Sequence, residues 1–116
     1  IRGVIGIAGP YDFLPLTDEN LKIIFSTAPD AETQPIHHMR GIMPPALLAT
    51  GDADDTVDPR NSERVQAKLT QLHSPVEMRS YAGVGHIGII LSLADGFRGR
   101  APLLDDIASF ITSTSP

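Results

Sequence analysis

Three short runs of strand-forming residues, separated by segments with helical spacing, constrain the fold of this chain more than any other feature. The first run covers residues 1–8 and the second covers residues 45–50, and both are almost continuously apolar. The third run, residues 76–81, mixes polar and apolar side chains. Continuous apolar runs are typical of strands buried on both faces of a parallel sheet, and we place the mixed run near a sheet edge. Because the runs alternate with helical segments, the sequence predicts an α/β fold with a parallel sheet and right-handed crossovers.

Two helices are expected between the runs. Thr17 can cap the first, whose apolar side would consist of Leu21, Ile24 and Phe25. Residues 26–43 then have a turn-like composition without clear periodicity. Asp58 can cap the second helix, with Pro59 at its first position, where a missing N–H costs nothing. The apolar side of this second helix would consist of Val65, Leu69 and Leu72.

Two further helices are expected after the third run. A short apolar helix follows residues 83–86 and ends at Gly96. The last helix starts near Pro102, with Asp105 and Asp106 in its first turn, where negative charge favours the helix dipole. The side chains expected on its buried side are Leu103, Leu104, Ile107, Phe110 and Ile111.

Composition excludes several classes of function. The chain has 116 residues, which fits a single domain over residues 1–116, and its formal net charge is −5 without a basic stripe, so we expect no nucleic-acid partner. It has no cysteine, which excludes disulfides, thiolate metal sites and cysteine nucleophiles. No apolar run reaches the roughly 18 residues of a membrane span, so we expect a soluble protein without a membrane partner. The compartment is not fixed by the sequence, although we favour the cytoplasm over secretion.

Two polar loops carry the candidate chemistry. Residues 51–58 follow the second predicted strand and offer carboxylates, and residues 83–88 follow the third and offer one histidine among glycines. In parallel sheets, ligands bind beyond the carboxyl ends of the strands, and neighbouring loops meet there. An aspartate that orients and charge-stabilises a histidine makes two-thirds of a nucleophilic triad.

The sequence of these loops resembles a known family. Residues 48–57, LATGDADDTV, are similar to the acid loop of α/β-hydrolases, and this resemblance implies that Asp54 is the catalytic acid. Residues 81–86, YAGVGH, resemble the family's histidine loop, which implies that His86 is the base. The order of acid before histidine is the order expected after the nucleophile in this fold. Residues 9–13, GPYDF, resemble a segment of bacterial carboxylesterases.

Taken together, these motifs imply a fold class and a function. The fold would be a three-layer α/β structure with a parallel sheet, namely the last three strands of the eight-stranded α/β-hydrolase fold, truncated. The chain would be the C-terminal part of a serine carboxylic-ester hydrolase, and the partner of the intact parent would be a small ester. Phe13, Leu14 and Ile87 are plausible pocket walls by their loop positions.

The departure from the family pattern is the missing nucleophile. No G-x-S-x-G occurs in the chain, so the serine and the oxyanion loop should lie upstream of Ile1. The chain also opens inside the apolar run 1–8, which we interpret as a truncated or processed start. We therefore expect that the chain alone is inactive.

Other interpretations of the polar residues remain open. Adjacent aspartates blur the register of the acid loop, so Asp55 is the fallback for the acid, while Asp52, Asp55 and Asp58 are better candidates than Asp54 for solvated carboxylates. His37, His38 and His73 are expected at the surface, without a metal site. No metal and no cofactor are expected.

Two motif matches are rejected. Residues 83–88 match G-x-G-x-x-G, but a dinucleotide site also needs a later strand that ends in an acid. Residues 52–63 place oxygen donors at the positions of a calcium loop, but Val57 stands where that loop needs glycine, and a strand precedes it instead of a helix.

Two alternative functions remain. The chain could be a non-catalytic interaction module, or one half of a two-chain enzyme whose other subunit supplies the serine. In the first case a truncated sheet would expose the edge of the strand Ile1 to Ala8, which is a ready site for another strand. We therefore expect a homodimer or higher oligomer built through this strand.

Overall fold

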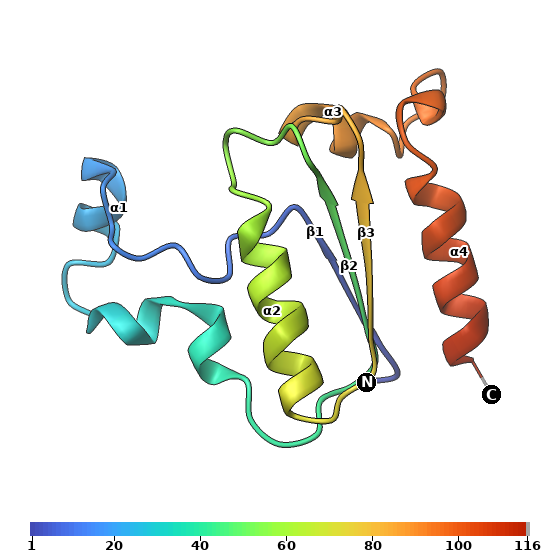
Figure 1. Cartoon of the computed structure of the whole chain (residues 1–116). Helices are drawn as coiled ribbons and strands as arrows, with labels where there is room; N and C mark the ends of the chain where they lie inside the picture. The colour runs from blue at the N-terminus through green and yellow to red at the C-terminus, as the bar shows by residue number, and fades with distance from the viewer. Residues whose placement is uncertain (116) are drawn as a thin grey trace.

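The computed structural model describes residues 1–115, and within them three strands form one parallel sheet (Figure 1). The strands are β1 (Val4–Ile7), β2 (Ala46–Gly51) and β3 (Val76–Tyr81), in the order β1-β2-β3. The register pairs Gly6 with Leu48 and Leu48 with Met78. The predicted parallel α/β fold is confirmed, and so is the edge position of the third strand.

The helices follow the strands in the predicted order. Their bounds are α1 (Glu19–Ile24), α2 (Arg60–Gln71), α3 (His86–Leu91) and α4 (Leu103–Thr114). Short 3₁₀ helices occupy Asp30–Thr33, Pro35–His38 and Arg98–Arg100. Within residues 1–115, no helix is long and apolar enough to cross a membrane.

The sheet is covered on both faces, which gives three layers. Figure 1 shows α2 on one side of the strands and α4 on the other. On the α2 side, Ala46 and Leu48 pack in one cluster with Val65 and Leu69. On the opposite side, Ala49 packs with residues of α3 and α4 such as Ile89 and Leu103. Because successive side chains of a strand point to opposite faces, β2 contributes to both cores and is buried along its whole length.

The first strand differs from its prediction. The run 1–8 was expected to be a strand buried on both faces, but β1 covers only Val4–Ile7, Ile1 is fully exposed and Val4 is 46% exposed. The reason is that β1 pairs with β2 alone within residues 1–115. Its outer edge is open within the described chain, although Ile7 still packs against the core on the α3 and α4 side of the sheet.

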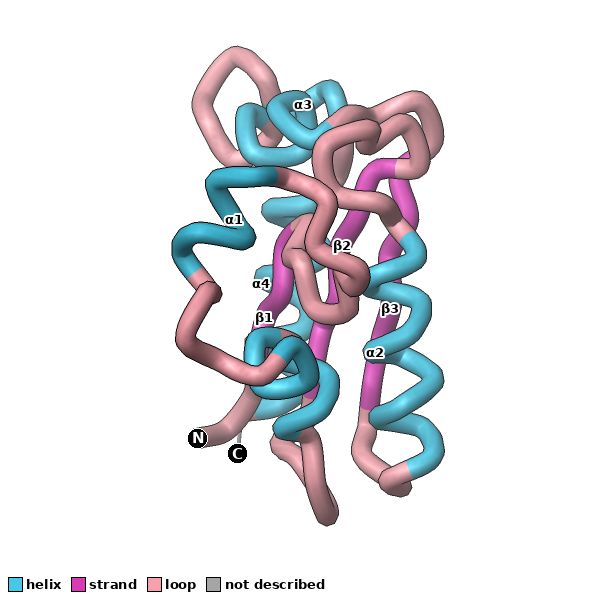
Figure 2. The backbone as a smooth tube through the Cα atoms, turned by 90° about the vertical axis from the view of Figure 1, so that its left-hand side faces the viewer, coloured by secondary structure: helices cyan, strands magenta, loops and turns pink. Residues whose placement is uncertain are grey.

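The cap of the first helix was predicted one residue too early. Asp18, not Thr17, is the N-cap, and its Oδ1 accepts hydrogen bonds from Asn20 N (2.8 Å) and Leu21 N (3.1 Å). A carboxylate next to the helix start reaches these N–H groups directly. The apolar side predicted for this helix is not buried, because α1 lies away from the sheet, as Figure 1 shows; in Figure 2 the same side of the molecule faces the viewer.

Two other helix predictions need correction. The helix predicted to end at Gly96 is α3, which ends at Leu91 and continues as turns. In α4, Leu103 and Phe110 are buried as predicted, but Ile111 is 52% exposed. The helix α2 begins at Arg60 with Pro59 as its N-cap and no side-chain cap, one residue later than predicted; Asp58 Oδ1 still accepts a hydrogen bond from Arg60 N at 2.9 Å.

Candidate active site

The two predicted site residues follow adjacent strands. Asp54 lies in the turn after β2, and His86 is the first residue of α3, shortly after β3. Gly51 at the end of β2 pairs with Tyr81 at the end of β3. Because parallel strands end at the same edge of a sheet, the two loops leave the sheet side by side.

The structure brings Asp54 and His86 into direct contact. Asp54 Oδ2 and His86 Nδ1 lie 2.9 Å apart, a normal hydrogen-bond length. The Asp54 side chain is completely buried, whereas 29% of the His86 side chain is exposed. The carboxylate is therefore shielded behind the imidazole, and the imidazole itself reaches the surface.

The second oxygen of the Asp54 carboxylate is held by its own loop. Oδ1 accepts hydrogen bonds from Val57 N (2.9 Å) and Thr56 N (3.0 Å). Burial raises the pKa of Asp54, but the hydrogen bonds from Val57, His86 and Thr56 together lower the pKa by more, so it lies below its ordinary value. Asp54 is therefore ionised at neutral pH and can only accept hydrogen bonds. It follows that Nδ1 of His86 carries a proton, and the lone pair of a neutral ring is on Nε2.

A glycine allows the two loops to approach each other. A Cβ atom on Gly51 would overlap the carbonyl oxygen of Val84, so any larger residue would push the acid loop away from the histidine loop. On the other side, Gly83 has φ +71°, a conformation that favours glycine. The role of Gly51 depends on a neighbour 33 positions away in the chain and cannot be predicted from the local sequence.

The remaining candidates do not join the pair. Asp55 is exposed and, within residues 1–115, makes no hydrogen bond to His86. Asp58 binds Arg60. The side chains of the other three histidines, His37, His38 and His73, are exposed as predicted. In the part of the chain that the structure describes, no cluster of three acidic or histidine residues could hold a metal ion.

A cavity of about 580 Å³ lies beside the acid loop. Phe13 and Leu14 line it, as expected for pocket walls, whereas Ile87 does not. It meets the acid loop at Thr56 and Val57, but neither residue of the hydrogen-bonded pair lines it. The other residues around it are Pro10, Asp12, Leu21, Phe25, Asp58, Arg60, Asn61 and Arg64.

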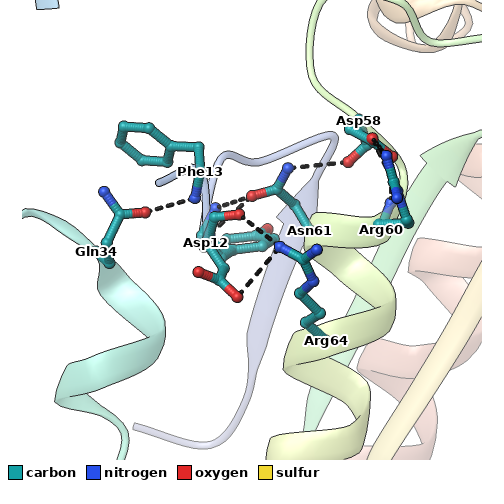
Figure 3. Close-up of polar contacts among 8 residues, drawn as sticks. Asp12, Phe13, Gln34, Asp58, Arg60, Asn61 and Arg64 are labelled. Atoms are coloured by element: carbon teal, nitrogen blue, oxygen red, sulfur yellow. Dashed lines mark hydrogen bonds and ion pairs between the residues drawn. The ribbon is translucent and has the colours of Figure 1, made fainter. Parts of the chain in front are cut away.

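Buried amide side chains hold the loop that forms one wall of this cavity (Figure 3). Asn61 Oδ1 accepts hydrogen bonds from Tyr11 N (3.0 Å) and Asp12 N (2.7 Å). Gln34 Oε1 accepts one from Phe13 N at 2.5 Å. Both amides are almost fully buried. Sequence reasoning missed them, because nothing in their local sequence distinguishes a buried amide from an exposed one.

Comparison with solved structures identifies the fold. Thermogutta terrifontis esterase 2 phosphoramylated by tabun is 20% identical, with a TM-score of 0.67, and the match covers 99% of this chain and 43% of that chain. The apo form of the same esterase gives 20% identity and a TM-score of 0.68 over 99% of this chain and 44% of that one. A truncated carbohydrate esterase from gut microbiota is 17% identical, with a TM-score of 0.61, and the match covers 86% of this chain and 42% of that chain.

These matches confirm the predicted α/β-hydrolase fold, and the chain spans less than half the length of the solved structures it matches. No curated protein matches the chain.

The family is given by a comparison of sequences. A model of the prolyl oligopeptidase family matches residues 17–112, which is most of the chain. The matched region contains the acid loop, the histidine loop and both members of the hydrogen-bonded pair, Asp54 and His86. The chain belongs to the prolyl oligopeptidase family.

Proposed function

We propose that this chain supplies the acid and the base of a serine-dependent carboxylic-ester hydrolase. The observation that carries the proposal is the 2.9 Å contact between a fully buried Asp54 carboxylate and a partly exposed His86 ring. A structural ion pair would not need one partner buried and the other open to a reactant. A general base needs this arrangement, because its imidazole must be oriented from behind and accessible from the front.

In this proposal His86 transfers the protons and Asp54 orients and stabilises the His86 ring. Nε2 of His86 takes the proton of the serine hydroxyl while the serine oxygen attacks the acyl carbon. His86 then gives that proton to the leaving alcohol, and the same cycle with water releases the acid. Asp54 keeps the proton of the neutral ring on Nδ1 and stabilises the imidazolium while it exists, without being protonated itself.

The proposal places the nucleophile outside these 116 residues. No G-x-S-x-G occurs among them, and within residues 1–115 no serine hydroxyl is hydrogen-bonded to the His86 ring. The backbone donors that would stabilise the oxyanion belong with that missing motif. The expected consequence is that the chain alone does not turn over esters through a triad.

We favour an ester over a peptide as the substrate, because the similar solved structures named above are esterases. They match most of this chain. The family name points to peptides, and the same acid and base would serve an amide bond. An ester and an amide with the same acyl group separate the two, for example the p-nitrophenyl ester and the p-nitroanilide of one N-blocked proline. For each substrate, the catalysed rate is divided by the rate of its uncatalysed hydrolysis. The proposal expects this ratio to be much larger for the ester than for the anilide.

The experiment has two steps. With the chain alone and p-nitrophenyl acetate, we expect no more hydrolysis than free imidazole gives, and saturable turnover abolished by His86→Ala would contradict this expectation. The coding sequence before Ile1 should then contain an in-frame G-x-S-x-G. A longer chain with that serine should hydrolyse the ester and lose activity by orders of magnitude with Ser→Ala, His86→Ala or Asp54→Asn. Unchanged activity in the two variants of this chain would overturn the proposed roles.

A further inference from the structure

We infer that Asp52 is a positioning residue, which sets the distance between Asp54 and His86 by clamping the histidine loop. The inference rests on the proposed function of that pair and adds a residue to it. It starts from a short contact: Asp52 Oδ1 accepts a hydrogen bond from Gly83 N at 2.6 Å, between residues 31 positions apart in the chain.

Besides the Asp54–His86 contact itself, three hydrogen bonds join the two loops beyond the ends of their strands, and this contact is one of them. Asp52 N donates to Tyr81 O (3.1 Å), and Ala53 N donates to Val84 O (3.1 Å). These two are backbone contacts that continue the pairing of β2 with β3. The contact of the Asp52 side chain is different, because it depends on the residue type and can be removed by substitution.

The clamp acts close to both members of the pair. Asp52 lies two residues before Asp54, and Gly83 lies three residues before His86. Gly83 has φ +71°, a conformation that favours glycine, and its N–H donates to the acid loop. In the described part of the chain, no acceptor other than Asp52 is hydrogen-bonded to this N–H. Loss of the side-chain acceptor would therefore free the turn that leads into His86.

Another role for Asp52 finds no support in the geometry. Within residues 1–115 no group of three or more acidic or histidine side chains is arranged as a metal site. It also does not line the cavity beside the acid loop. Among residues 1–115, the hydrogen-bond partner of its side chain is the backbone of the histidine loop.

The test uses the ¹⁵N-labelled full chain and three variants. Asp52→Ala removes the acceptor, Asp52→Asn keeps an oxygen that can accept from Gly83 N but removes the charge, and Asp55→Ala removes an exposed neighbouring charge as a control. Two signals are followed: hydrogen exchange of the Gly83 amide, and solvent exchange of the His86 Nδ1 proton. The second signal reports on the pair itself, so general softening of the surface does not move it.

With Asp52→Ala we expect both exchange rates to rise about tenfold, the effect of losing one hydrogen bond to a charged group. Asp52→Asn keeps a neutral hydrogen bond about half as strong, so its rates should rise only about threefold. Asp55→Ala should stay within about twofold of the original chain. The inference is overturned if Asp52→Ala leaves the His86 proton unchanged, if Asp52→Asn behaves like Asp52→Ala, or if amides throughout β2 exchange faster as well. Any of these results leaves the separate test of Asp54 intact, so the two proposals can fail independently.

Discussion

The two edges of the sheet are built in opposite ways. The edge strand β3 carries two exposed charged residues, Glu77 and Arg79. The hydroxyl of its final residue, Tyr81, donates a 2.5 Å hydrogen bond to Asp106 of α4. At the β1 edge the strand carries no charge, and a groove of about 280 Å³ beside it is lined by Val4, Ile5 and apolar residues around them. Charges on an edge strand prevent further pairing, whereas an apolar edge invites it.

The difference follows the position of the candidate site. Asp54 and His86 lie just beyond the ends of β2 and β3, where hydrogen bonds tie the two loops to each other. The loop after β1 is held by the buried amides of Asn61 and Gln34, but the helix α1 that follows has no buried residue. We conclude that hydrogen bonds close the sheet edge where the pair is held, whereas the sheet is open where β1 ends it.

The largest loss of stability is expected when a buried side chain of the central strand is shortened. Leu47 in β2 is fully buried, so Leu47→Ala should lower the free energy of unfolding by about 2–5 kcal/mol. Ile24→Ala, at a side chain that is 67% exposed, should change it by about 0.5 kcal/mol or less. Urea denaturation of both variants measures this contrast. Equal losses would show that α1 is packed far more tightly than its exposure indicates.

A smaller loss of stability is expected from a substitution where the acid loop meets the histidine loop. Gly51→Ala places a Cβ atom against the Val84 carbonyl, and overpacking of this kind costs about 1–3 kcal/mol. The matched control is Gly99→Ala, because no atom lies within 4 Å of a Cβ built there. Thermal unfolding should separate the two variants. If Gly51→Ala were as stable as the control, the close approach of the loops would be wrong.

The open edge leads to a prediction about assembly. We propose that the chain self-associates through β1, since strand pairing with a second copy would satisfy its outward N–H and C=O groups. Val4 N and Ala8 N bond toward β2, so by alternation Ile5 N points outward. Ile5→Pro should therefore block the edge without breaking the ladder.

Light scattering at micromolar concentration checks this prediction. We expect a mass of two or more chains for the original protein and of one chain for Ile5→Pro. A single-chain mass for the original protein, with slow amide exchange along β1, would mean that the edge is covered in another way.

The smallest effect concerns pH. The pKa of Asp54 is lower in the folded chain than in the unfolded one, so ionised Asp54 stabilises the fold at pH values above the ordinary carboxyl pKa of about 3.9. This contribution is lost as the pH falls through the folded-state pKa. The difference in unfolding free energy between the original chain and Asp54→Asn should therefore narrow below about pH 4. Asp55→Asn serves as the control. A difference that stayed constant down to pH 2 would contradict the lowered pKa.

Much of this arrangement could be predicted from the sequence, and the exceptions share a physical cause. The strands were predictable because β2 is apolar on both faces, and the pair Asp54 and His86 because the loops carry recognisable motifs. The exposure of β1 was not, because a run of apolar residues does not reveal whether a neighbour is present to cover it. Asp52 is exposed, as expected of a solvated carboxylate, but its hydrogen bond to Gly83 N could not be predicted, since Gly83 is distant in the chain.

The most direct test of the central claim is the tautomer of His86, read from long-range ¹H–¹⁵N spectra at a pH where the ring is neutral. In the original chain Asp54 can only accept, so the proton should reside on Nδ1 and leave Nε2 free to act as a base. In Asp54→Asn the amide oxygen should keep the hydrogen bonds from Thr56 N and Val57 N, which turns the amide NH₂ toward His86. The ring should then switch to the Nε2–H form. A proton on Nε2 in the original chain, or the same tautomer in both proteins, would contradict the account.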